Sequence, residues 1–136
     1  MTRSAVESIL VIGADPASMG EIGPQPPGMT TQDVYDLIDR QGREIGELAG
    51  QVLTSLVARD GTSVPDLGQA LDSRPWDLIV VGAGIHRAPP FLAAFEDVMN
   101  LLHAHPQQRG AVLAFAQSVA EVTDAARRKV QELRGA

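Results

Sequence analysis

The chain has 136 residues, of which 44% are hydrophobic and 21% are charged, and this composition is typical of one globular domain spanning residues 1–136. Its net charge of −6 argues against nucleic acid as a partner, and the absence of cysteine excludes disulfides, zinc–thiolate centres and a cysteine nucleophile. No apolar run approaches the roughly 20 residues of a membrane span, and Glu7 interrupts the N-terminal segment before it could serve as a signal peptide. We therefore expect a cytoplasmic protein with neither a nucleic-acid partner nor a membrane partner.

Two short apolar runs, rich in β-branched residues, each end at a Gly-Ala pair. They read ILVIGAD at residues 9–15 and LIVVGAG at residues 78–84. Such runs are typical of strands that are buried on both faces, as in a parallel sheet covered by helices. Ligands of such sheets bind beyond the carboxyl ends of the strands, so these two strand ends are the first place to look for a site.

The segment after the first strand, residues 15–28, holds four prolines and three glycines and predicts a loop without helix or central strand. Thr30 or Thr31 then caps a helix that Gly50 ends. Glycines at positions 42, 46 and 50 recur every four residues of that helix. This stripe indicates close packing, either on the sheet or on another helix.

Further strands and helices alternate along the rest of the chain. We expect strands at 51–58, 78–81 and 111–115, a helix at 64–73 capped by Ser63, a helix from Pro89 and Pro90 to His103, and a last helix that starts at Ser118 or Thr123 and ends in Arg127, Arg128 and Lys129. The order βαβαβαβα with right-handed crossovers predicts a three-layer α/β sandwich with a four-stranded parallel sheet. The expected strand order is 2-1-3-4, which is flavodoxin-like or Rossmann-like, with the switch point between strands 1 and 3.

Four stretches of the chain carry a resemblance that spans most of its length. They are ILVIGADP, then PGMT at the start of a helix, then WDLIVVGAGI and APPFLAAFEDVMNLLHAH. Together they resemble a group of small bacterial α/β proteins of uncharacterised function. The resemblance implies the same fold, with the second strand after Gly50, and it implies no particular reaction.

A dinucleotide site is the first functional alternative at the second Gly-Ala motif. The run GAGIHR at residues 82–87 has arginine where the dinucleotide fingerprint has its third glycine or alanine. Residues 88–90 (Ala-Pro-Pro) are expected to delay the helix that should meet the pyrophosphate, and Gln117 and Ser118 stand where an acidic residue would bind ribose. The sequence therefore disfavours a nicotinamide or flavin dinucleotide and leaves the cofactor unassigned.

An anion-binding site at the switch point is the leading hypothesis. Asp15 and His86 form a possible acid–base pair there, and Arg87 offers a fork of donors for a carboxylate or phosphate. Backbone at Gly13, Gly82 and Gly84 would line the site, with Gln117 or Ser118 on its rim. The structural alternative is that Asp15 caps its loop and pairs with Arg87.

Two further features bear on metal binding and on assembly. His103 and His105 are two residues apart on a helix and point about 200° away from each other, so no metal site is expected there. The helix at 90–103 has an apolar arc wider than a sheet-covering helix commonly needs. Together with the glycine stripe, this arc favours an alternative function as a non-catalytic homodimeric module, which is compatible with a small-molecule site.

Overall fold

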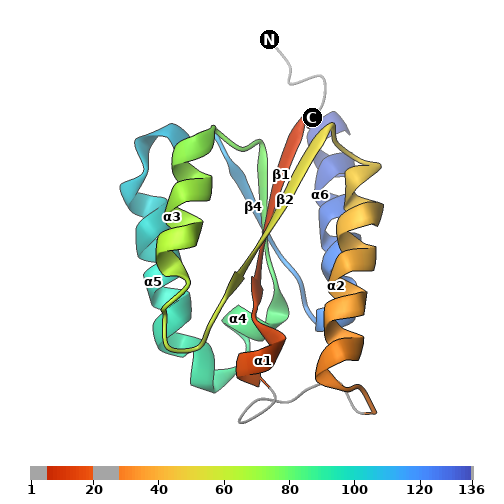
Figure 1. Cartoon of the computed structure of the whole chain (residues 1–136). Helices are drawn as coiled ribbons and strands as arrows, with labels where there is room; N and C mark the ends of the chain where they lie inside the picture. Colours follow the sequence, from red (N-terminus) through yellow and green to blue (C-terminus); the bar gives the residue numbers. More distant parts are fainter. Residues whose placement is uncertain (1–5, 20–27, 136) are drawn as a thin grey trace.

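A computed structural model describes residues 6–19 and 28–135, so most of the predicted loop at 15–28 lies outside the described residues. The four strands are β1 (Ser8–Ala14), β2 (Gln51–Val57), β3 (Leu78–Val81) and β4 (Val112–Phe115). All pair in parallel, in the order β2-β1-β3-β4. The predicted α/β sandwich and its strand order are confirmed (Figure 1).

The two central strands carry the twin apolar runs. Residues 9–12 of β1 pair in register with residues 78–81 of β3, and all eight side chains are buried. Full burial of one such side chain stabilises the fold by about 1.5–3 kcal/mol. The apolar runs are thus explained by a sheet that is covered on both faces.

Two helices cover each face of the sheet (Figure 1). Leu10 and Ile12 of β1 face the core beneath α3 (Val64–Ser73) and α5 (Leu92–Ala104). Ile9 and Val11 point the opposite way, to the core beneath α2 (Thr31–Gly46) and α6 (Val122–Gly135). This alternation is the period of two that a strand imposes on its side chains.

Helix α2 begins as expected and ends early. Thr30 is its N-cap, and a reciprocal capping box joins the side chain and backbone of Thr30 to those of Asp33. The helix ends at Gly46, so the prediction that Gly50 ends it is wrong. Residues 47–50 instead form the turn that brings the chain into β2, where Gln51 N–H donates to Glu7 O (3.1 Å).

Two short helices form at the carboxyl edge of the sheet, where the sequence predicts none. The prediction that residues 15–28 contain no helix is wrong for α1 (Pro16–Met19), because proline is accepted at a first helical position. The predicted delay of the helix after β3 is also wrong, since α4 (Ala83–His86) begins directly after Gly82. The helix expected from Pro89 follows as η1 (Pro89–Phe91) and α5. The chain therefore turns twice at the end of β3 before it runs back along the sheet.

The remaining helix ends depart from the prediction in detail. The Ser63 side chain makes no cap hydrogen bond, although its residue precedes α3. Ser118 precedes η3 (Val119–Glu121), the turn that leads into α6. Because α6 runs on to Gly135, the cations at 127–129 lie within the helix and do not end it. Among the described helices, none is long and apolar enough to cross a bilayer.

Candidate functional site

The carboxyl ends of β3 and β4 lead into the segments that carry most of the predicted ligand-binding residues. The Gly82 N–H donates to Ile12 O (2.8 Å), and the Ala116 N–H donates to Val81 O (3.0 Å). These bonds extend the parallel ladder by one step beyond each strand. They fix the positions of α4 and of residues 116–118 relative to the sheet.

A crevice of about 230 Å³ lies between these two segments. Its walls come from the α4 end and from the start of η3, and its lining residues are Ala83, Gly84, Arg87, Ala88, Gln117, Ser118 and Val119. Four residues that the sequence predicted for ligand binding thus share one hollow: Gly84, Arg87, Gln117 and Ser118. The hollow lies at the ends of β3 and β4, one strand away from the β1/β3 switch point where the sequence located the site.

Arg87 is the cation of this crevice. It is exposed, and its Nη1 donates to Gln117 O (3.0 Å), which holds the side chain across the ends of the two strands. Among the residues that the structure describes, this is the one hydrogen bond of the guanidinium. Because an arginine has five N–H donors, most of them remain available to an anion in the crevice.

Ser118 lines the wall of the crevice opposite Arg87, and Glu121 lies beside Ser118. The Ser118 hydroxyl donates to Glu121 Oε1 (2.7 Å) at the start of η3. The first N–H groups of a helix attract an anion. The Glu121 carboxylate is negatively charged and therefore repels one. The crevice therefore combines one cation and a helix start with one nearby acid.

His86 is held outside the crevice. Its Nε2 lies 2.6 Å from Ala116 O, so this nitrogen donates to the carbonyl and Nδ1 carries the lone pair of the neutral ring. The ring packs edge-on against Phe115 (5.3 Å between centroids) and also contacts Phe95 (6.4 Å). The side chain thus lies on the α5 side of the sheet, beside the edge strand β4.

Asp15 is engaged with Tyr35, a residue that the sequence did not single out. The Tyr35 hydroxyl donates to Asp15 Oδ1 (2.5 Å), and the same oxygen accepts from Ala17 N–H (3.1 Å), which caps α1. The hydrogen bond to the carboxylate, with burial and the negative charge adding to it, raises the pKa of Tyr35. The position of Tyr35 near the start of the helix that follows β1 is the sequence feature that could have indicated its contact with Asp15.

The acid–base pairing of Asp15 with His86 receives no support from these contacts. Within residues 6–19 and 28–135, no hydrogen bond or ion pair joins Asp15 to His86 or to Arg87. Asp15 lies on the β2 side, where its N–H donates to Val57 O, and the other two residues contact the end of β4. The structure thus brings Arg87 together with Gln117 and Ser118, while the Asp15 carboxylate is engaged by Tyr35 and Ala17.

A second, apolar cavity of about 40 Å³ lies between α2 and the carboxyl half of the sheet. Gly13, Gly82 and Gly84 line it, so the three predicted glycines share one cavity. A Cβ added to Gly13 would lie 3.3 Å from Leu56 Cδ2, and one on Gly82 would lie 3.4 Å from Ile12 O. A side chain at Gly13 would therefore lie against Leu56, and one at Gly82 against the backbone of β1.

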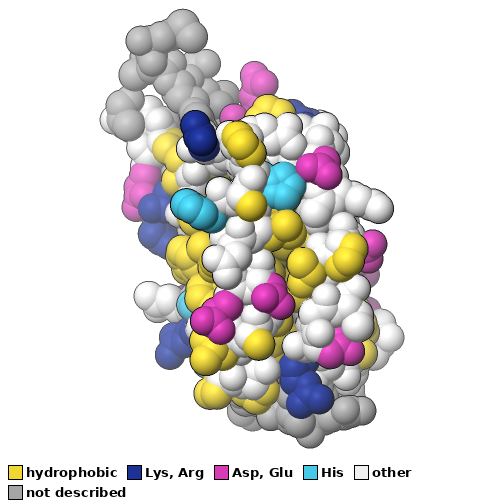
Figure 2. All heavy atoms as spheres, turned by 90° about the vertical axis from the view of Figure 1, so that its left-hand side faces the viewer, with side chains coloured by type: hydrophobic (Ala, Val, Ile, Leu, Met, Phe, Trp, Pro, Cys, Tyr) yellow, Lys and Arg dark blue, Asp and Glu magenta, His cyan; other side chains and the backbone are white. Residues whose placement is uncertain are grey.

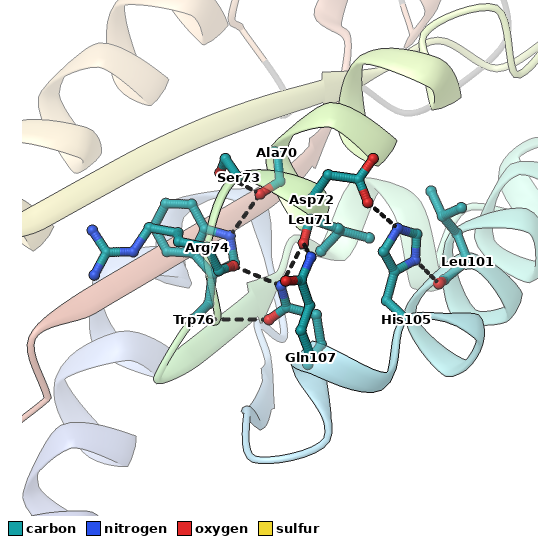
Figure 3. Close-up of polar contacts among 10 residues, drawn as sticks. Ala70, Leu71, Asp72, Ser73, Arg74, Trp76, Leu101, His105 and Gln107 are labelled. Atoms are coloured by element: carbon teal, nitrogen blue, oxygen red, sulfur yellow. Dashed lines mark hydrogen bonds and ion pairs between the residues drawn. The ribbon is translucent and has the colours of Figure 1, made fainter.

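The histidines of the predicted His-x-His pair lie at the opposite end of the sheet. His105 follows α5, and its ring nitrogens lie 2.7 Å from Leu101 O and 3.0 Å from Asp72 Oδ1 (Figure 3). The described part of the chain holds no group of three histidine, aspartate or glutamate side chains that could bind a metal ion. His105 therefore joins α5 to α3.

Comparison of the chain with protein-family models, with curated proteins and with solved structures finds no match. The fold and the crevice define the class: a small three-layer α/β protein with a polar hollow at the carboxyl edge of a parallel sheet.

Proposed function

We propose that this protein binds a small anionic molecule in the crevice between α4 and the start of η3. The observation that carries the proposal is the convergence of Arg87, Gln117 and Ser118 on one hollow at the carboxyl edge of the sheet. Parallel α/β sheets bind their ligands at this edge. We assign binding and no reaction, because the Asp15 carboxylate contacts Tyr35 and the His86 ring contacts Ala116 O.

The chemistry of the crevice favours a carboxylate or phosphate. A guanidinium binds either group through two parallel N–H donors, and such charge-assisted bonds are about twice as strong as neutral ones. Arg87 is already oriented by its bond to Gln117 O, which lowers the entropy lost when an anion binds. The N–H groups at the start of η3 and α6 add to the same preference.

Isothermal titration calorimetry with inorganic phosphate, acetate and propanoate tests the proposal. Loss of a charge-assisted bond costs about 1.5–3 kcal/mol, so Arg87→Ala is expected to weaken binding by about 10- to 100-fold. Arg109→Ala is the matched control, because Arg109 is also exposed but lies near the amino end of β4. Equal binding by Arg87→Ala and the wild type would contradict the proposal.

A non-catalytic homodimeric module is the second candidate function. The observation in its favour is apolar exposure on the α5 side, where Leu92 of α5 is 60% exposed and Phe115 of the edge strand β4 is 37% exposed. Figure 2 views the face that α3 and α5 form, where hydrophobic side chains gather along the middle with acidic side chains among them. Light scattering at micromolar concentration is expected to give the mass of a dimer that Leu92→Asp reduces to a monomer. A monomeric wild type would contradict this candidate.

A further inference from the structure

Strand β2 forms one edge of the sheet, and its outer side pairs with no strand among the described residues. Figure 1 shows β2 in front of the other strands, between α3 and α2. Its seven residues, QVLTSLV, include no charge, proline or glycine, and they pair with β1 in an unbroken register. Proteins usually protect an exposed edge by a charge, a proline, a bulge or a short strand. The other edge, β4, has only four residues, so β2 is the edge that is open to a further strand.

The free backbone groups of β2 belong to alternate residues. The Gln51 N–H donates to Glu7 O (3.1 Å). At the other end of the strand, Val57 O accepts from Asp15 N–H (2.9 Å). Because alternate residues of a strand form their hydrogen bonds on opposite sides, the odd-numbered residues of β2 bond to β1. Three residues therefore present their N–H and C=O groups outward: Val52, Thr54 and Leu56.

A second copy of β2 fits this edge in an antiparallel register. Thr54 is the middle residue of β2 and one of the three residues that point outward. A two-fold axis beside Thr54 therefore pairs all seven residues of one strand with those of the other. Each outward residue then exchanges two N–H···O bonds with the residue opposite it, as hydrogen-bonded pairs of antiparallel strands do. Thr54 meets the partner's Thr54, and a threonine pair is one of the cross-strand contacts that stabilise a sheet.

The same register covers an exposed apolar side chain of β2. Leu53 is 42% exposed. It pairs with Leu10, whose side chain faces the core beneath α3 and α5, so Leu53 lies on that face of the sheet. In the two-fold register Leu53 lies opposite the partner's Ser55, a small residue that leaves room for it. Removal of this apolar surface from water favours association.

The surface of α2 beside this edge is complementary to itself. A groove of about 360 Å³ lies between α2 and β2, and Asp39, Gly42 and Arg43 of α2 line it. A Cβ on Gly42 would lie 3.9 Å from Thr54 Oγ1, so Gly42 is level with the two-fold axis. The partner's α2 runs the opposite way. Asp39 then lies within about 3 Å, measured along the helix axis, of the level of the partner's Arg43.

Both charged side chains are available for this contact. Asp39 and Arg43 are exposed, and neither makes a hydrogen bond or an ion pair with another residue of the described ranges. The two-fold axis repeats the pair, so each copy offers one acid and one cation to the other. Gly42 and Gly46 add no side chains to this surface of α2, which allows the two helices to approach closely.

We propose that two copies of the chain associate through their β2 edges, so that the two four-stranded sheets become one continuous sheet and α2 of each copy lies against α2 of the other. A two-fold interface requires a surface that complements itself, and β2 and α2 both meet this requirement. The partner is therefore a second copy of the chain rather than an unrelated peptide. Neither the anion crevice nor the exposed α5 face includes this edge.

Leu53→Lys tests the strand contact. Light scattering across the micromolar range is expected to show a wild-type dimer. The substitution is expected to weaken dimerisation by at least about tenfold, because a lysine on an edge strand opposes the addition of another strand. Leu92→Lys is the matched control, because Leu92 is also exposed (60%) but belongs to α5. Urea denaturation followed by tryptophan fluorescence verifies that each variant is folded.

Asp39→Arg and Arg43→Asp test the two-fold axis. Either substitution alone puts like charges against the partner, so each variant is expected to be mostly monomeric at a concentration where the wild type is half dimeric. An equimolar mixture of the two variants is expected to dimerise, because one chain then carries two arginines and the other two aspartates. A chain with both substitutions is expected to dimerise like the wild type.

Each outcome decides for or against the proposal. A dimer that Leu53→Lys dissociates, that Leu92→Lys retains and that the mixture of the two charge variants restores supports it. A wild type that is monomeric across the micromolar range overturns it. A dimer that withstands Leu53→Lys also overturns it, and loss of that dimer in Leu92→Lys would locate the interface on the α5 face. A mixture of the charge variants that stays monomeric overturns the two-fold contact of α2.

Discussion

The two ends of the sheet use polar side chains in different ways. At the amino end, the Gln108 amide accepts from Trp76 N–H (3.0 Å) and donates to the carbonyls of Leu71 (2.8 Å) and Arg74 (2.7 Å). At the carboxyl end, the guanidinium of Arg87 makes one hydrogen bond among the described residues. Polar groups that are satisfied within the protein hold the fold, and groups with spare donors are the ones available to a ligand.

One atom at the amino end departs from this contrast. Arg74 Nε is buried without a hydrogen-bond partner among the described residues. Its guanidinium carbon lies 5.4 Å from the centroid of the Trp76 ring, so the guanidinium makes a cation–π contact there. Even this arginine is therefore engaged with the fold.

The largest expected effect is on stability, at the amino end. Gln108→Ala takes the side-chain partner from Trp76 N–H and from the Arg74 carbonyl, while the Leu71 carbonyl keeps its bond from Gln107. The variant is expected to lower the free energy of unfolding by about 2–4 kcal/mol. Urea denaturation followed by the fluorescence of Trp76, the one tryptophan of the chain, measures this loss. Anion binding by the folded variant is expected to be unchanged.

Gln107→Ala is the control for that measurement. Gln107 is exposed, and its side chain donates to the same Leu71 carbonyl. The Leu71 carbonyl keeps its bond from Gln108 in this variant, so a loss below about 1 kcal/mol is expected. Equal losses in the two variants would break the contrast between buried and exposed polar groups at this end.

A smaller effect is expected at the β1 side of the carboxyl end. Tyr35→Phe removes the hydroxyl that donates to Asp15 and is expected to lower the free energy of unfolding by about 1 kcal/mol at neutral pH. Because the hydrogen bond to Asp15 raises the folded pKa of Tyr35 above its ordinary value of 10.0, this stabilisation is present at neutral pH and is lost as the pH rises through the folded pKa.

An absorbance titration measures that pKa directly, because Tyr35 is the one tyrosine in the chain. The ionisation midpoint is expected above 10.0 in the native protein and near 10 in urea. Identical midpoints in the two states would remove the evidence that Tyr35 holds Asp15. Asp15 would then be available to a ligand, and the division of the carboxyl edge into a structural side and a binding side would fail.

The smallest expected effect is on the strength of anion binding. Glu121 places a carboxylate beside Ser118, which lines the crevice. Glu121→Gln removes that negative charge and is expected to tighten phosphate binding by about two- to fivefold at low salt. Asp124→Asn is a comparison in the next turn of α6, where the carboxylate pairs with Arg127 and not with a residue that lines the crevice. An equal effect of the two substitutions would indicate a general charge effect.

The strands and their order could be predicted because full burial leaves an unbroken apolar run at residues 9–12 and 78–81. Arg87, Gln117 and Ser118 could be predicted as neighbours because parallel strands end at one edge. The contacts of Asp15 and His86 could not be predicted in this way, because the direction of a side chain beyond a strand end depends on the conformation of the local turn. The one-turn helix α4 directs His86 to Ala116 O, and the Asp15 carboxylate caps α1.

Chemical-shift mapping tests most directly the claim that the crevice at the ends of β3 and β4 is the binding site. With ¹⁵N-labelled protein, addition of phosphate or propanoate is expected to shift the backbone amides of Gly84, Arg87 and residues 117–119. The amides of residues 71–76, at the amino end, are expected to stay unchanged. Shifts confined to the amino end, or the same shifts in Arg87→Ala as in the wild type, would contradict the claim.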